Sequence, residues 1–227
     1  MKAFYFARTD RKLRYGDNRK IVVGETHTVD CTPEVCSKGL HASVNLFDAL
    51  KYAPGPILYL VELDGDVDIG CDKVAATKRT YLAEFDATEV LREYARIQAS
   101  YSVHLIKPYR TEDQYKDITH FLSTGENANA ALDAALDTSQ AIFDVSVSVS
   151  VHAAPANPTI LDAYNAANAV YNAVDAALAA ANTASDAAYA AAVAGALAAF
   201  NCSTHNKIPD QNETLTNMIR EATEWDI

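Results

Sequence analysis

Positively charged residues are scarce in the C-terminal half of the sequence. Residues 117–206 contain no Lys or Arg, and residues 87–227 carry 7 Lys and Arg against 17 Asp and Glu. This half therefore accounts for −10 of the formal net charge of −11. A nucleic-acid-binding surface needs clustered cations, so no such surface is expected there. The basic residues of 8–20 alternate with acidic and aromatic ones and predict a solvated hairpin, so no nucleic-acid partner is predicted.

Long apolar runs and paired cysteines are also scarce. No apolar run reaches the length of a membrane span, and the N-terminus lacks the apolar segment of a signal peptide. We therefore expect a cytoplasmic protein with no membrane partner. Of the four cysteines, Cys31 and Cys36 form a close pair, but no second close pair completes a zinc site. No metal site is predicted, and the cysteines are expected to be buried free thiols.

Known catalytic and cofactor motifs are missing as well. The chain has no Gly-rich phosphate loop, no Ser-His-Asp order and no zinc-protease motif. No cofactor is therefore predicted, and the sequence favours a protein without enzymatic activity.

The most informative stretch is 36–63. Leu46, Phe47 and Leu50 recur at helical spacing and predict a short helix over 46–53, with Asn45 or Ser43 as its cap. Residues 54–56 read Pro-Gly-Pro and end this helix. The continuous apolar run over 57–63 predicts a central strand that is covered on both faces.

Before this helix, residues 39–43 read Gly-Leu-His-Ala-Ser and predict a turn with a polar tip. His41 has two interpretations here. It either hydrogen-bonds a backbone carbonyl and locks the turn, or it is an exposed contact residue. The first interpretation predicts a loss of stability in His41→Ala, and the second predicts a loss of function alone.

Residues 1–86 predict a compact domain with a small mixed β-sheet, the turn at 39–43 and the short helix. Aromatic residues favour a first strand over 2–8. Asp64-Gly65 is interpreted as the turn of a hairpin, because the acidic residues that follow it lack the order of a calcium loop. The fold class predicted for the whole chain is α+β.

Residues 87–227 predict a helical region. Alanine dominates about 126–200 and has the best helix propensity, so an Ala-rich bundle is expected there. Such helices bury little apolar area each, which predicts a protein partner or a homo-oligomer packed against them. Residues 145–151 alternate Val with Ser, leaving helix and strand open. A terminal amphipathic helix is expected over about 209–225.

Residues 3–86 resemble a family of uncharacterised bacteriophage and bacterial proteins. The resemblance lies in short segments that include Cys-Ser-Lys-Gly-Leu-His-Ala-Ser at 36–43, together with residues 13–17, 23–26, 48–55, 61–65 and 72–75. It implies a phage or prophage setting and supplies no established activity.

A fainter similarity is to ADP-ribosyltransferase-like folds. It rests on the polar tip, the short helix ending in Tyr-Ala and the strand that follows. This similarity implies that Arg14 or His41 would hold a nicotinamide dinucleotide and that Ser43 would line its pocket. The catalytic glutamate of that fold is not evident, with Glu62 and Glu84 as possible substitutes. The candidate binding residues are thus Arg14, His41, Ser43 and Glu62.

These observations give two functional expectations. The first is a non-enzymatic phage or prophage accessory protein that acts by protein–protein contact, either in the host cytoplasm or in the virion. The alternative is an NAD-using enzyme of the ADP-ribosyltransferase kind. Convergence of His41 and Arg14 with Glu62 or Glu84 in an open cleft would favour the enzyme.

Overall fold

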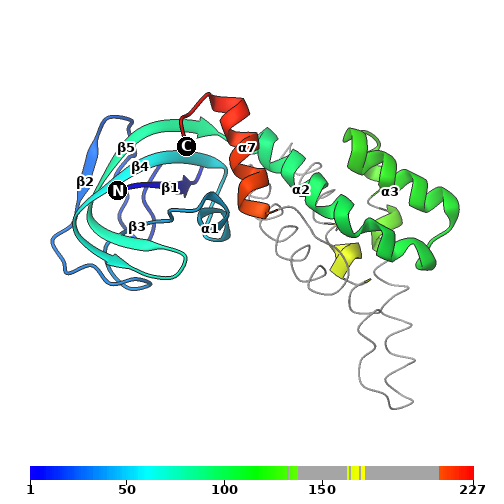
Figure 1. The fold of residues 1–227 in the computed structure, drawn as a ribbon, viewed down its shortest axis with the longest axis horizontal. Coiled ribbons are helices and arrows are strands. Elements are labelled where there is room, and N and C mark those ends of the chain that lie inside the picture. The colour runs from blue at the N-terminus through cyan, green and yellow to red at the C-terminus, as the bar shows by residue number, and fades with distance from the viewer. Residues whose placement is uncertain (132, 138–162, 164, 169, 172–209) are drawn as a thin grey trace, which may run out of the picture. The chain divides into compact units, whose positions relative to one another are not determined.

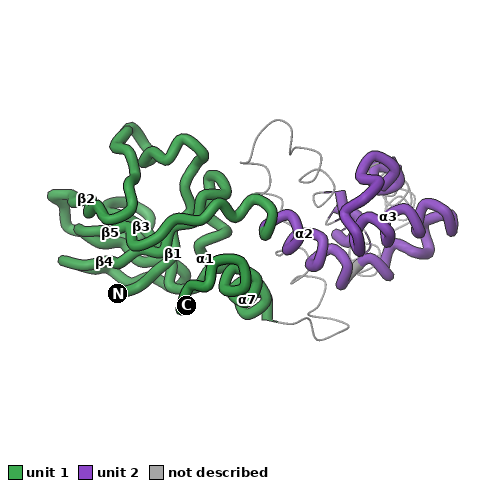
Figure 2. The backbone as a smooth tube through the Cα atoms, turned by 90° about the horizontal axis from the view of Figure 1, so that it is seen from above, with its two compact units in different colours: residues 1–90, 210–227 green, residues 91–209 purple. Residues whose placement is uncertain are grey.

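The computed structural model describes residues 1–131, 133–137, 163, 165–168, 170–171 and 210–227. The chain divides into two compact units (Figure 2). Unit 1 comprises Met1–Val90 and Asp210–Ile227, and unit 2 comprises Leu91–Pro209. The expected boundary near residue 86 thus lies close to the first division. The terminal segment, which was expected in the helical region, instead belongs with the sheet.

A long antiparallel hairpin organises unit 1 (Figure 1). Its strands are β4, Ile57–Ile69, and β5, Val74–Asp86. The first residues of β4, Ile57 to Val61, are all buried, so the expected central strand is confirmed and continues further than its apolar run.

The turn of this hairpin differs from the expected one. Asp64-Gly65 lies within β4 at an irregularity of the register between Asp64 and Val67. Gly65 has a φ of 77°, and a Cβ there would stand 2.1 Å from Thr77 Oγ1. The Asp66 amide donates to the same hydroxyl at 3.0 Å. Asp-Gly therefore forms a bulge that bends the hairpin, and the chain reverses at residues 70–73.

Three short strands complete the sheet. β1, Lys2–Ala7, pairs with β4, while β2, Thr26–Thr28, and β3, Leu40–Ala42, pair with β5. Phe4 and Ser43 exchange backbone hydrogen bonds of 2.7 and 3.0 Å, which ties β1 to β3. The pairs run β1–β4–β5–β3 and back to β1, so the bent hairpin closes a circuit of strands. The α+β class is confirmed, and every pair of the described sheet is antiparallel rather than mixed.

The expected turn at 39–43 is therefore mostly strand β3. Gly39 keeps the turn character, because its φ of 104° lies in the left-handed region that glycine adopts freely. Leu40 and Ala42 are buried on one side of β3, and His41 alternates to the other. The pairing with β5 thus decides the conformation of this segment.

The helix α1, Leu46–Lys51, is capped from a distant part of the chain. Asn45 occupies the N-cap position, but its side chain makes no capping bond. The Phe47 amide instead donates to Asn212 Oδ1 at 3.1 Å. Asn212 lies in α7, Gln211–Thr223, which packs on α1 (Figure 1). The expected terminal helix is present, and it supplies the cap that the sequence assigned to Asn45 or Ser43.

Unit 2 is helical where it is described. The helix α2, Thr88–Ser102, begins just before the division at Val90 and continues into unit 2. It is followed by the 3-10 segment η1, Val103–Tyr109, and by α3, Glu112–Thr124. A capping box between Thr111 and Gln114 begins α3. Residues 128–131 and 133–137 are also helical. Most of the Ala-rich region at about 126–200, including 145–151, lies outside the described residues. No described helix is long and apolar enough to cross a membrane.

Candidate functional site

Unit 1 contains a half-open cleft of about 820 Å³, which we call the Arg79 cleft. Its walls come from β1, the loop at 13–17, the segment at 36–43, the end of α1, and the start and middle of β5. The polar and aromatic residues that line it are Phe4, Tyr5, Phe6, Arg14, Tyr15, Asp17, Cys36, Ser37, His41, Ser43, Tyr52, Lys73 and Arg79. This volume falls within the range of small-molecule sites.

Arg79 on β5 lines this cleft, and only 2% of it is exposed. Its Nε and Nη2 donate to the Tyr81 hydroxyl at 3.1 and 2.8 Å. Its Nη1 donates to the His41 carbonyl at 2.5 Å. Arg79 thus joins β5 to β3 and holds the segment that carries His41.

The positive charge of Arg79 has no carboxylate partner. Among the residues that the structure describes, no Asp or Glu lies within ion-pair distance of its guanidinium. The guanidinium instead lies over the Tyr5 ring, 3.8 Å from its centroid. A cation over an aromatic face gains about 2 kcal/mol when it is desolvated. That gain offsets only part of the several kcal/mol that burying an ion costs.

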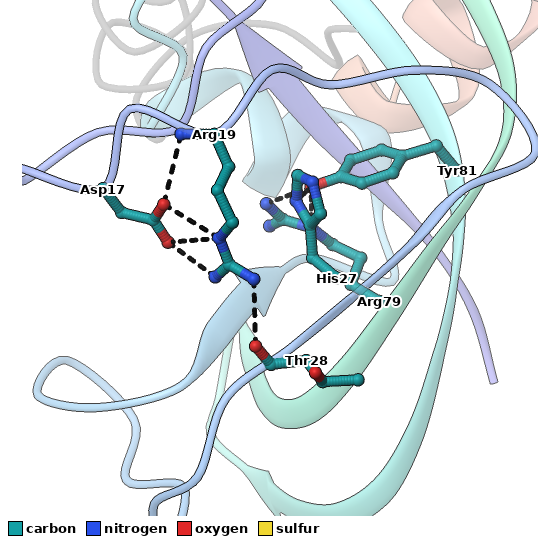
Figure 3. A network of polar contacts seen from close by, with 6 residues as sticks. All are labelled: Asp17, Arg19, His27, Thr28, Arg79 and Tyr81. Carbon is teal, nitrogen blue, oxygen red and sulfur yellow. Dashed lines mark hydrogen bonds and ion pairs between the residues drawn. The ribbon is translucent and has the colours of Figure 1, made fainter.

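A hydrogen-bond relay fixes the protonation of His27 (Figure 3). The Tyr81 hydroxyl accepts two bonds from Arg79, so its own proton is directed to His27 Nδ1 at 3.0 Å. His27 therefore accepts at Nδ1 and is neutral. Burial lowers the pKa of His27, and the cations Arg19 and Arg79 act in the same direction. The relay leaves the charge on Arg79 uncompensated.

Asp17 is the one carboxylate among the described residues that lines the cleft, and it is already paired. Arg19 Nη2 lies 2.6 Å from Asp17 Oδ2, and Arg19 Nη1 donates to the Thr28 carbonyl at 3.0 Å (Figure 3). The hydrogen bond from Arg19 is the main cause that lowers the pKa of Asp17. Asp17 therefore neutralises Arg19 and not the cations of the cleft.

Two further cations line the cleft beside aromatic rings. The Arg14 guanidinium lies 4.9 Å from the Tyr15 ring centroid, and the Lys73 ammonium lies 3.9 Å from that of Tyr52. Both rings belong to exposed residues, with Tyr15 exposed by 92% and Tyr52 by 44%. These pairs give the cleft a cationic and aromatic character where it opens to solvent.

His41 lies on β3 with its imidazole half-buried in the cleft. Its Nε2 is buried and has no hydrogen-bond partner. Desolvation is the main cause that lowers the pKa of His41, and the nearby carbonyls of Glu34 and Gly39 oppose that shift. The pairing of β3 with β5 and the bond from Arg79 to the His41 carbonyl both hold this segment, so His41 is held through its backbone. The role of its side chain in locking the turn stays a prediction.

The structure brings together three of the four candidate residues. Arg14, His41 and Ser43 all line the Arg79 cleft, whereas Glu62 does not. Glu62 is an exposed residue of β4 opposite Lys2 and Thr80.

Glu84, the other possible substitute for a catalytic glutamate, does not line the cleft either. It accepts from Tyr59 at 2.5 Å and from Arg11 at 2.8 Å. The carboxylate of Glu84 is thus occupied, and no glutamate joins His41 and Arg14.

Sequence reasoning missed Arg79 and its partners Tyr5 and Tyr81. A signal was present, because Arg79 and Tyr81 are two residues apart in a strand and so share a face. A cation two residues from a buried aromatic residue in a strand is predicted to point into the protein as well. Recognising it required the extent of β5 over Val74–Asp86, which the sequence did not delimit.

Comparison with known proteins gives one family match, and it covers the residues of the cleft. Residues 4–93 match the family model described as a domain of unknown function (DUF7666). This supports the resemblance to an uncharacterised family over the N-terminal part. Every residue that lines the Arg79 cleft lies within the matched segment. No curated protein and no solved structure matches the chain.

Proposed function

We propose that this chain is a non-enzymatic accessory protein whose unit 1 acts by binding a partner molecule in the Arg79 cleft. The observation that carries the proposal is the composition of the cleft. It combines three cations with aromatic rings, and Asp17, the only carboxylate that lines it in the described part of the chain, is held by Arg19. Such a cleft supports recognition, because cations in a hollow with low-dielectric walls raise the local concentration of anionic partners.

The phage or prophage setting and the protein partner stay predictions from the sequence. The composition of the cleft supports binding, and it does not bear on the biological setting or on the identity of the partner.

Cross-linking at the cleft tests the proposal. A photoreactive amino acid at Tyr15, which is exposed and lines the cleft, should form a discrete adduct in cells that express the protein. The same amino acid at Ile69, which is 66% exposed and does not line the cleft, serves as the matched control. Equal labelling at both positions, or none at Tyr15, would contradict binding at the cleft.

A second candidate function is an NAD-using transferase, favoured by the convergence of Arg14, His41 and Ser43 in one cleft. It predicts release of nicotinamide from NAD by the purified protein. We expect no release, since neither Glu62 nor Glu84 lines the cleft. Release that disappears in His41→Ala would establish the enzyme in place of the binding protein.

A further inference from the structure

Arg79, which lines the cleft, retains hydrogen-bonding capacity beyond its contacts within the protein. A guanidinium has more N–H donors than the three hydrogen bonds that Arg79 makes to Tyr81 and the His41 carbonyl. The remaining donors belong to its terminal nitrogens, which present a planar fork suited to oxyanions. Arg79 is therefore both a brace of the sheet and a donor with free N–H groups at the wall of the cleft.

The charge of the cleft also points to an anion. Arg14, Lys73 and Arg79 line it, and within the described residues none of the three forms an ion pair with a carboxylate. The chain as a whole carries −11, so a concentration of unpaired cations is contrary to its average character. Cations in a hollow with low-dielectric walls raise the local concentration of anions.

His41 adds a neutral polar group to these cations. Its Nε2 is buried without a partner, and an unsatisfied buried polar atom costs about 1–3 kcal/mol. His41 therefore lines the cleft as a wall residue, with its Nε2 closed to solvent. Arg79 and His41 are already linked, because the backbone carbonyl of His41 accepts from Arg79.

We infer that the Arg79 cleft binds the phosphate group of a nucleoside monophosphate. This inference rests on the proposed function and names the ligand class of the same site. The free donors of Arg79 contact the phosphate oxygens, and Arg14 and Lys73 neutralise its charge. A phosphate monoester carries about −1.5 to −2 at neutral pH, which matches several cations better than a single carboxylate does.

The remainder of the cleft suits the nucleoside. A volume of about 820 Å³ is larger than a bare phosphate requires. Bases stack on aromatic side chains, and Tyr15 and Tyr52 offer such rings at the cleft. The ligand is therefore an aromatic-bearing phosphate monoester and not an inorganic ion.

Calorimetric titration of the full chain tests the inference. The probes are a panel of nucleoside 5′-monophosphates, each matching nucleoside, and inorganic phosphate. At least one monophosphate should bind, and its nucleoside should bind about ten- to hundredfold more weakly, because charge-assisted hydrogen bonds are lost.

Four variants assign the contacts. Arg14→Gln and Lys73→Gln alter partly exposed side chains and should each weaken binding about tenfold. Arg79→Lys keeps the charge but removes the planar fork, and it should weaken binding at least as much. Lys78→Gln, on the neighbouring exposed position of β5, is the matched control and should bind like the wild type. Urea unfolding establishes that each variant is folded.

Three results would overturn the inference. They are failure of every monophosphate to bind, equal affinity for a monophosphate and its nucleoside, and unchanged affinity in both Arg14→Gln and Lys73→Gln. Arg14→Gln and Lys73→Gln test the inference even if Arg79→Lys does not fold. If the Tyr15 cross-link persists while the phosphate probes fail, the ligand class is wrong and the binding function stands.

Discussion

The N-terminus of α1 provides the sharpest test of the fold, because two asparagines compete for the role of its cap. Asn45 stands at the N-cap position without a capping bond, while Asn212 accepts from the Phe47 amide at 3.1 Å. We therefore expect Asn212→Ala to destabilise unit 1 and Asn45→Ala to have little effect.

The magnitude follows from the group that loses its partner. Replacing a capping Asn by Ala costs about 0.5–2 kcal/mol, and an unsatisfied, partly buried N–H costs about 1–3 kcal/mol. We expect about 1–2 kcal/mol for Asn212→Ala. Asn45→Ala loses only an exposed bond to Asp48, so we expect less than about 0.5 kcal/mol.

Trp225 provides the assay. It is the only tryptophan of the chain and lies edge-on to Phe85 in unit 1, with ring centroids 6.4 Å apart. Its fluorescence during urea unfolding therefore reports on unit 1. Asn212→Asp retains the acceptor and should keep most of the stability. A cost in Asn45→Ala equal to that in Asn212→Ala would refute the assignment of the cap.

Three further predictions concern the same unit. Because burial lowers the pKa of His27, the unfolded chain binds the proton more tightly, and the free energy of unfolding should fall as the pH drops below about 6.5. In urea midpoints measured from pH 7.5 to about 5, His27→Gln should reduce this dependence on pH. An unchanged dependence would contradict the neutral state of His27. Gly65→Ala should lower the free energy of unfolding from urea titrations by about 1–3 kcal/mol, since Cβ would stand 2.1 Å from Thr77 Oγ1 at a positive φ. Wild-type stability would show that no bulge forms there. Removal of 210–227 should speed hydrogen exchange of the α1 amides, because α7 packs on α1 and caps it; unaltered protection would show that α1 is stable without α7.

The relation between α1 and the cleft gives these tests a functional consequence. Ala49 of α1 and Tyr52 at its C-cap both line the Arg79 cleft. The cap from Asn212 thus supports an element of the cleft wall. Residues from both ends of the chain therefore contribute to the site, although the lining residues all lie in the N-terminal part.

The sequence by itself determined the features that depend on short-range order. The apolar run at the start of β4 predicted a strand buried on both faces, and helical spacing predicted α1 and α7. Strand patterns over 1–86 followed by helical ones over 87–227 predicted the α+β class. Each of these follows from periodicity or propensity within one segment, so no knowledge of distant residues was needed.

Only the tertiary structure decided the contacts between segments. Gly-Leu-His-Ala-Ser became a strand because β5 offers it unpaired backbone groups, and Asp64-Gly65 became a bulge because Thr77 lies across the hairpin. Asn212 caps a helix 165 positions away along the chain. Arg79 is buried because β1 supplies the face of Tyr5, while β3 and β5 supply the His41 carbonyl and the Tyr81 hydroxyl. Such partners meet through strand pairing and packing, which no local pattern of residues specifies.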